Sequence, residues 1–229
     1  LPPGVNHATV AEHPFLLLLM LFKKAAFHVR ETREGRWSRK TGNEILGKTM
    51  GVIGLGRIGK EVAMRARAFG LSVVAYDLYW DDEFARAHEI ARAEDLDAIW
   101  SSADVISLHT NLNDETRGMI NQASIGKMKD GVLILNCARG EIIETRDLIE
   151  ALRSGKVGGY GADVLDEEPP PPDHPLLAIE NCVITPHIGS RTQESVVRQA
   201  TKAIENLARA FDGREPHAQV NPEVPVSPK

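Results

Sequence analysis

Residues 50–59 form a short apolar run that leads directly into a group of three glycines. Their sequence is Met50-Gly51-Val52-Ile53-Gly54-Leu55-Gly56-Arg57-Ile58-Gly59. The glycines match the pattern G-x-G-x-x-G, with a predicted strand before them and a predicted helix after them. Gly54 permits a tight turn, Gly56 lets the backbone approach a pyrophosphate, and Gly59 allows the helix to pack closely on the sheet. Because the start of a helix presents free amides to phosphates, this stretch predicts a dinucleotide-binding turn.

An acidic residue, Asp77, ends the next predicted strand, 18 residues after Gly59. Its carboxylate can accept hydrogen bonds from the adenosine ribose hydroxyls, and it would repel the 2′-phosphate of NADP. The residues that follow, Leu78, Tyr79 and Trp80, supply no cation to hold such a phosphate. The sequence therefore predicts NAD rather than NADP. The alternative is a glycine-rich turn with an incidental acid, since chance matches occur in a chain with 19 glycines.

The rest of the chain alternates short apolar runs with helical patterns. Runs this short and this apolar, without alternation, are typical of strands buried on both faces of a parallel sheet. The predicted strands are residues 50–53, 72–76, 105–108, 132–135, 159–163 and 183–185. The predicted helices that follow the first strand are residues 60–69, 94–101, 145–154 and 193–211. This order indicates an α/β fold, a Rossmann-type doubly wound parallel sheet with flanking helices.

Composition excludes several classes of function. The chain has 229 residues, of which 42% are apolar and 26% are charged, and its net charge is −5. Without a basic excess, it is not expected to bind a nucleic acid. Its longest apolar run, residues 15–22, is much shorter than the roughly 20 residues of a membrane span. Cys137 and Cys182 lack the spacing of a metal site or of a disulfide framework. The sequence therefore predicts a soluble, cytoplasmic protein without a metal ion or a membrane segment.

The front of the chain predicts one helix from Thr9 to Arg33, in which Pro14 is an awkward residue. Thr9 and Glu12 have the spacing of a capping box. Residues 15–22 are apolar on nearly all sides, so the helix must be buried. Two alternatives remain open. Either a second copy of the protein covers the helix, which predicts a homodimer, or the helix lies in the core of its own chain. Six histidines are interpreted as surface or capping residues: His7, His13, His28, His88, His174 and His217.

Three polar residues in the second half have settings that local structure does not explain. Arg139 follows a predicted buried strand, where a guanidinium can hold a carboxylate through two parallel hydrogen bonds. Glu168 stands at the start of a loop with four consecutive prolines, residues 169–172. His187 follows the last predicted strand, and a histidine there can exchange a proton near neutral pH. Each residue alone has an ordinary structural interpretation, as a surface cation, a solvated acid or a turn histidine.

Together these segments resemble the NAD-dependent D-2-hydroxyacid dehydrogenase family, which includes phosphoglycerate and hydroxypyruvate/glyoxylate dehydrogenases. The motifs occur in the family's order across residues 5–222. Besides residues 47–59, the matching pieces are Leu108-His109-Thr110, Thr116-Arg117-Gly118-Met119-Ile120-Asn121, Leu135-Asn136-Cys137-Ala138-Arg139-Gly140, Ala162-Asp163-Val164 with Glu168-Pro169, and Thr185-Pro186-His187-Ile188-Gly189.

The resemblance implies a role for each matching residue. Arg139 would hold the substrate carboxylate, His187 would be the catalytic acid and base, and Glu168 would pair with His187. Arg57 and Ile58 would offer backbone amides to the pyrophosphate. The residues expected to bind or line the NAD cofactor are Gly54, Gly56, Arg57, Ile58, Gly59, Asp77, Thr110, Cys137, Ala138, Arg139, Asp163, His187, Gly189 and Ser190.

The resemblance also implies a division of the chain. Residues 1–8 would be the remnant of a hinge, residues 9–190 the NAD-binding Rossmann domain, and residues 191–229 a helix and tail returning toward a substrate domain. In the family that domain precedes the hinge, and most of it is absent here. The expected activity is hydride transfer between NAD(H) and a small D-2-hydroxy acid or 2-keto acid. The alternative is a truncated, non-catalytic module that binds NAD(H) and dimerises.

Overall fold

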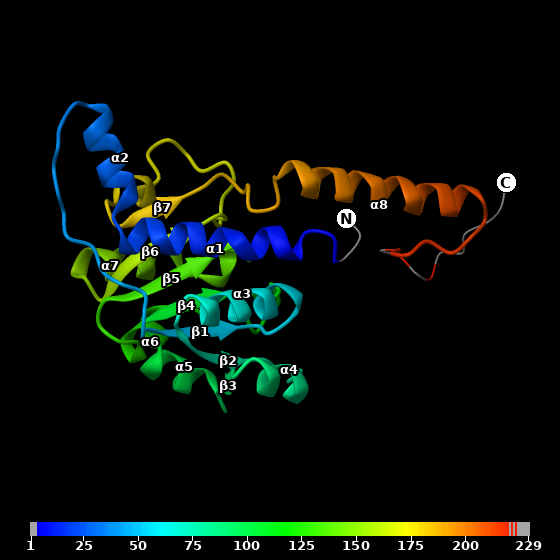
Figure 1. The fold of residues 1–229 in the computed structure, drawn as a ribbon, viewed down its shortest axis with the longest axis horizontal. Helices are drawn as coiled ribbons and strands as arrows, with labels where there is room; N and C mark the ends of the chain where they lie inside the picture. Colours follow the sequence, from blue (N-terminus) through cyan, green and yellow to red (C-terminus); the bar gives the residue numbers. More distant parts are fainter. Residues whose placement is uncertain (1–3, 220, 222, 224–229) are drawn as a thin grey trace.

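The fold is built on one parallel sheet. A computed structural model describes residues 4–219, 221 and 223. Within these residues seven strands pair in the order β3-β2-β1-β4-β5-β6-β7, and every pairing is parallel (Figure 1). The strands are β1 (Thr49–Ile53), β2 (Ser72–Tyr76), β3 (Ala91–Arg92), β4 (Val105–Leu108), β5 (Val132–Asn136), β6 (Val157–Ala162) and β7 (Cys182–Ile184).

Helices cover both faces of this sheet, as a doubly wound fold requires. On one face α1 and α3 pack together and against the strands, and on the other face lie α5, α6 and α7. The helices are α1 (His7–Phe22), α2 (Ala25–Arg33), α3 (Arg57–Ala68), α4 (Asp82–Ala87), α5 (Leu96–Ser102), α6 (Gln122–Lys127), α7 (Thr145–Ser154) and α8 (Gln193–Phe211), with short 3₁₀ turns η1 (Gly140–Ile142) and η2 (Pro175–Ala178).

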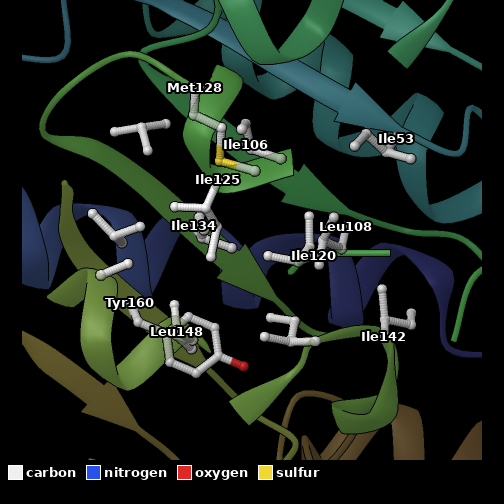
Figure 2. Packing of buried hydrophobic residues seen from close by; sticks show 14 of the residues in the cluster. Ile53, Ile106, Leu108, Ile120, Ile125, Met128, Ile134, Ile142, Leu148 and Tyr160 are labelled. Carbon is white, nitrogen blue, oxygen red and sulfur yellow. The ribbon is translucent and has the colours of Figure 1, made fainter. Parts of the chain in front are cut away.

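The central strands are apolar because side chains on both their faces are buried. All four residues of β4 are buried, and Figure 2 shows Ile106 of this strand close to Ile134 of its neighbour β5. Such strands carry a continuous apolar run instead of an alternating one. The predicted Rossmann-type sheet is therefore confirmed. Three short elements were not predicted: strand β3, which has two residues, and helices α4 and α6, which have six residues each.

The prediction for the first helix was wrong in two respects. The capping box is not formed, because α1 already begins at His7, after Asn6, and this end has no side-chain cap. Thr9 is instead inside the helix, where its hydroxyl faces Thr192 (Oγ1–Oγ1 3.4 Å). The helix also does not run on to Arg33. It ends at Phe22, and Lys24 then adopts a left-handed conformation, with φ +52°, before α2 begins.

The apolar side of α1 is covered by its own chain. Phe15, Leu17, Leu18 and Phe22 are buried among residues of α3 and the sheet, and the ring of Phe15 stacks on that of Phe69 at 5.3 Å. Of the two alternatives for this segment, the core helix describes what the structure contains. The burial of α1 therefore gives no support to a dimer.

The last helix, α8, has the bounds that its sequence pattern predicted. It projects away from the sheet, close to the start of α1 (Figure 1). Ser195 is its buried residue. Large apolar side chains along α8 are exposed: Val196, Val197, Ile204, Leu207 and Phe211. Parts of the predicted hinge and tail, residues 1–3, 220, 222 and 224–229, lie outside the described residues. Among the residues that are described, no helix combines the length and the apolar character needed to cross a bilayer.

The close approach of α3 to the turn before it leads to a test of the fold. A Cβ atom added at Gly59 would lie 1.9 Å from the carbonyl oxygen of Gly54, which is backbone and cannot move aside cheaply. We expect Gly59→Ala to lower the free energy of unfolding in urea by about 1–3 kcal/mol, the usual range for overpacking.

The matched control for this variant is Gly126→Ala. Gly126 is also helical, but a Cβ atom there would meet nothing within 4 Å. Alanine is a better helix former than glycine, so this variant should leave stability unchanged or raise it by up to about 1 kcal/mol. Equal effects of the two substitutions would contradict the packing described at Gly59.

Candidate functional site

The predicted site residues gather at one edge of the sheet, at the carboxyl ends of the strands. The chain moves outward from β1 to β2 and β3, then returns to β4 on the other side of β1. In open α/β sheets the crevice above such a reversal is where ligands bind. The predicted residues follow successive strands here: Gly54 and Gly56 after β1, Asp77 after β2, Thr110 after β4, Cys137, Ala138 and Arg139 after β5, Asp163 after β6, and His187, Gly189 and Ser190 after β7.

The glycine-rich turn has the shape that a phosphate group requires. Gly54 has φ +93°, and a Cβ atom there would come within 2.7 Å of the His109 carbonyl group. Above Gly56 nothing lies within 4 Å, so the backbone is open on this side. Gly56 is also the residue before α3, and no side chain caps that end. The first amides of α3, at Arg57 and Ile58, are therefore available to an anion.

Asp77 holds the glycine-rich turn as well as facing the crevice. Its Oδ2 atom accepts a hydrogen bond from the Leu55 amide at 2.5 Å, and its Oδ1 atom accepts one from the Tyr79 amide at 2.7 Å. A carboxylate has about four acceptor positions. These two bonds therefore orient the side chain and leave positions for the ribose hydroxyls that the sequence predicted as its partners.

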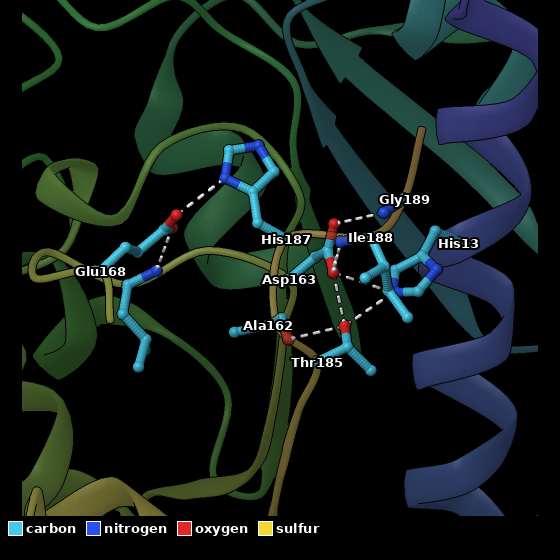
Figure 3. A network of polar contacts seen from close by, with 9 residues as sticks. His13, Ala162, Asp163, Glu168, Thr185, His187, Ile188 and Gly189 are labelled. Atoms are coloured by element: carbon cyan, nitrogen blue, oxygen red, sulfur yellow. Dashed lines mark hydrogen bonds and ion pairs between the residues drawn. The ribbon is translucent and has the colours of Figure 1, made fainter. Parts of the chain in front are cut away.

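His187 and Glu168 are brought together by the loops after β6 and β7. The His187 Nδ1 atom lies 2.8 Å from Glu168 Oε2, and Glu168 Oε1 accepts a hydrogen bond from the Leu165 amide at 3.0 Å (Figure 3). The imidazole remains about half exposed. His187 also has φ +55°, a left-handed conformation that non-glycine residues adopt mainly at turns and functional sites.

Arg139 stands beside this pair but does not contact it. Within the described residues its guanidinium donates to the Ala138 carbonyl oxygen (Nη1–O 2.6 Å), and the side chain is exposed. The loop that carries it is fixed by Asn136, whose side chain donates to the Arg139 carbonyl oxygen at 2.9 Å. A Cβ atom at Gly140 would lie 1.9 Å from the Leu165 carbonyl carbon, so the loops after β5 and β6 touch backbone to backbone.

Asp163 lies at the centre of a network of hydrogen bonds. Its Oδ1 atom accepts from the Thr185 hydroxyl at 2.6 Å and from the Ile188 amide at 2.8 Å, and its Oδ2 atom accepts from the Gly189 amide at 2.6 Å (Figure 3). His13, on α1, approaches Oδ1 at 3.3 Å. Burial alone would raise the pKa of Asp163, but the hydrogen bonds from these groups outweigh it and lower the pKa to about 2.

Comparison with known proteins shows which family has this arrangement of residues. Residues 15–189 match the family described as D-isomer specific 2-hydroxyacid dehydrogenase, NAD binding domain. The chain belongs to this family. As a member of it, the chain is an NAD-binding domain, and the open turn at Gly56 with the free amides of α3 fits the pyrophosphate of that cofactor.

Relatives within the family differ in length from this chain. A D-3-phosphoglycerate dehydrogenase of Archaeoglobus fulgidus is 41% identical over 222 residues, covering 96% of this chain and 42% of the relative. A hydroxypyruvate reductase of Thermotoga maritima is 42% identical over 209 residues, covering 90% and 67%. The crystal structure of D-lactate dehydrogenase with NAD+ from Lactobacillus jensenii is 30% identical, with a TM-score of 0.84, covering 95% and 70%. The chain thus spans less than half of the first relative.

Two histidines of this NAD-binding domain make contacts that the sequence did not suggest. His13 was predicted to be a surface or capping residue, but it is buried inside α1, with Nε2 2.7 Å from the Thr185 hydroxyl oxygen. No local pattern could reveal this, because its partner is 172 residues away. His109 binds the Ser107 hydroxyl (Nε2–Oγ 2.8 Å), and burial lowers its pKa to about 4. His109 is therefore neutral at physiological pH.

Cys137 has no sign of a catalytic thiolate. Burial, and next the charge of Asp163, raise the pKa of its thiol well above the ordinary value. The thiol therefore stays protonated beside the crevice. Within the described residues, no three His, Cys, Asp or Glu side chains are grouped so that they could hold a metal ion.

The low pKa of Asp163 gives a prediction about acid stability. The carboxylate titrates near pH 2 in the folded chain and near its ordinary value of 3.8 when unfolded. Its contribution to stability is therefore present above about pH 4 and is lost as the pH falls toward 2. We expect Asp163→Asn to be less stable than the unchanged chain at pH 7, and the difference to shrink by about 1–2 kcal/mol between pH 5 and pH 2.

Urea unfolding at a series of pH values measures this difference directly. The two chains share all other titrating groups, so subtracting their free energies of unfolding isolates residue 163. A difference that stays constant from pH 5 to pH 2 would contradict the ionised, hydrogen-bonded state of Asp163.

Proposed function

We propose that this chain is the cofactor-binding part of an oxidoreductase that transfers a hydride between NAD(H) and a small D-2-hydroxy acid or 2-keto acid. The observation that carries the proposal is the contact between His187 and Glu168, 2.8 Å long, at the same sheet edge as the glycine-rich turn. A module that only bound a dinucleotide would have no use for an imidazole paired with a carboxylate beside an open guanidinium.

The pair supplies the proton that hydride transfer requires. Bound NADH supplies the hydride, and the carbonyl oxygen of a keto acid then needs a proton. Since Glu168 accepts from the Nδ1 side of the His187 ring, the Nδ1 proton is held there, and Nε2 is the nitrogen that gives or takes the substrate proton. In the direction of oxidation the same nitrogen removes the hydroxyl proton.

Arg139 holds the other end of the substrate. Its exposed guanidinium stands after β5, next to the loop of Glu168, where a fork of N–H donors can bind a carboxylate through two parallel bonds. A 2-hydroxy or 2-keto acid has its carboxylate one bond from the reacting carbon. A cation and an acid–base group side by side therefore suit this class of substrate.

The protein is also proposed to act as a homodimer. The support comes from exposed apolar side chains near the front of the chain, on α1, on α2 and just after it: Leu16, Val29 and Trp37. Trp37 is 79% exposed, on a segment that is tied down next to it by the ion pair of Arg36 with Glu31. Light scattering should give twice the chain mass, whereas the mass of one chain would exclude a dimer.

The assignment of His187 can be tested by substitution. Asparagine tolerates positive φ, so His187→Asn keeps the backbone while removing the titrating ring. We expect turnover of NADH with glyoxylate, hydroxypyruvate or 3-phosphohydroxypyruvate to fall by about 10²–10⁴-fold, the usual worth of a general acid–base group, with NADH affinity unchanged by calorimetry.

The control is His217→Asn, an exposed histidine remote from the crevice, which should leave both measurements unchanged. A collapse of NADH affinity in His187→Asn would make His187 a structural residue. No turnover by the unchanged chain on any of these keto acids, together with tight NADH binding, would favour a non-catalytic binding module.

The choice of cofactor can be tested at Asp77. A carboxylate that accepts from the ribose hydroxyls repels the 2′-phosphate of NADP. We expect Asp77→Ala to weaken NADH binding and to narrow the preference for NADH over NADPH by about tenfold or more, in line with 1.5–3 kcal/mol for hydrogen bonds to a charged group. Calorimetric titrations with both cofactors measure the ratio, and an unchanged ratio would rule out the ribose role.

A further inference from the structure

A buried histidine on α1 has hydrogen-bond partners on the loops of the site. His13 is 8% exposed, and apart from Thr9 the other buried residues of α1 are apolar. Its Nε2 atom lies 2.7 Å from the Thr185 hydroxyl oxygen and 3.3 Å from Asp163 Oδ1. Burying a polar ring costs free energy unless its hydrogen bonds are made. Packing α1 against the sheet needs no such ring, so the polar contact itself requires a reason.

The direction of these hydrogen bonds can be assigned from the number of available protons. The Thr185 hydroxyl donates to Asp163 Oδ1 at 2.6 Å, and a hydroxyl has only one proton. Thr185 must therefore accept from His13, whose Nε2 atom carries the proton. The result is a series of hydrogen bonds in one direction: His13 donates to Thr185, and Thr185 donates to Asp163.

Asp163, the last residue in this series of hydrogen bonds, holds the turn that contains His187. Both carboxylate oxygens of Asp163 are used: Oδ1 accepts from the Ile188 amide at 2.8 Å and Oδ2 from the Gly189 amide at 2.6 Å. Gly189 is wedged between the two partners, because a Cβ atom there would lie 2.9 Å from Asp163 Oδ2 and 3.4 Å from His13 Cβ. The two residues after His187 are thus clamped to one buried carboxylate.

The clamp has a direct consequence for the direction of the His187 side chain. With φ +55°, His187 is in a conformation that costs a non-glycine residue free energy and persists only when its surroundings enforce it. That conformation aims the imidazole at Glu168, as Figure 3 shows, away from the clamped amides. Loosening the amides would let the backbone relax and would release the ring from Glu168.

We propose that His13 is a positioning residue for His187, acting through Thr185 and Asp163. The inference rests on the proposed function, in which His187 exchanges the substrate proton. Through these hydrogen bonds α1 holds the turn of His187 in its strained conformation, although α1 lies some 170 residues earlier in the sequence. His13 itself neither touches the proton path nor exchanges a proton in the reaction.

The test compares two substitutions of His13, of which His13→Gln keeps a hydrogen-bond donor and His13→Leu does not. Glutamine carries an amide N–H at about the reach of Nε2, whereas leucine fills a similar space without a donor. The measurement is amide hydrogen exchange, followed by NMR on ¹⁵N-labelled protein. At Ile188 and Gly189 we expect exchange about tenfold faster in His13→Leu than in the unchanged protein, because the hydrogen-bond network opens locally. His13→Gln should restore most of the protection, and amides of β1 should not change in either variant.

A control variant separates positioning from general stability. Leu17→Val removes packing on the same face of α1, one turn later, without touching the network. It should not single out Ile188 and Gly189. If His13→Leu does not fold, His13→Asn serves in its place, because its shorter amide cannot reach Thr185. Equal exchange in all variants at the two amides, or a rise that is uniform over the sheet, would overturn the proposal.

The amide measurement does not depend on turnover. A chain that fails to reduce any keto acid would refute the proposed function and would leave the exchange result intact. A catalytically active chain whose Ile188 and Gly189 amides ignore residue 13 would refute the positioning role alone. Where turnover is measurable, His13→Leu should lower kcat while NADH affinity is kept.

Discussion

One buried carboxylate joins the segments on which the site depends. Asp163 directly follows β6, and it binds the turn after β7 through two backbone amides and approaches His13 of α1. It remains ionised because its contacts with His13, the Thr185 hydroxyl and two backbone amides more than offset the cost of its burial. The turn that carries His187 is bound to this one carboxylate through the amides of Ile188 and Gly189.

Much of the fold could be predicted because its signals are local. Each central strand is a short, mostly apolar run, and the turn at Gly54 to Gly59 marks where the first strand gives way to a helix. The longest amphipathic helix, α8, was predicted to the residue. Errors arose where context decides. Thr9 and Glu12 have the spacing of a cap, but the helix extends beyond them because Thr9 packs against α8.

The site divides in the same way. The glycines, Asp77 and the residues that end β5, β6 and β7 could be predicted from sequence, since polar residues after apolar strands meet at one edge of a parallel sheet. The role of His13 could not, because its partners are separated from it by most of the chain. Arg139 is intermediate. Its place after β5 was predicted. In the structure its guanidinium donates to the backbone carbonyl oxygen of Ala138.

The sheet ends on both sides in strands that are very short. β3 has two residues and β7 has three, so each border offers few free backbone amides and carbonyl groups to a strand from another molecule. Pairing of an edge strand with a strand of another molecule, which leads many β-proteins to aggregate, is therefore disfavoured at both edges of the sheet. The short edges therefore favour association through side chains on the helices and loops, where shape and charge can select the partner.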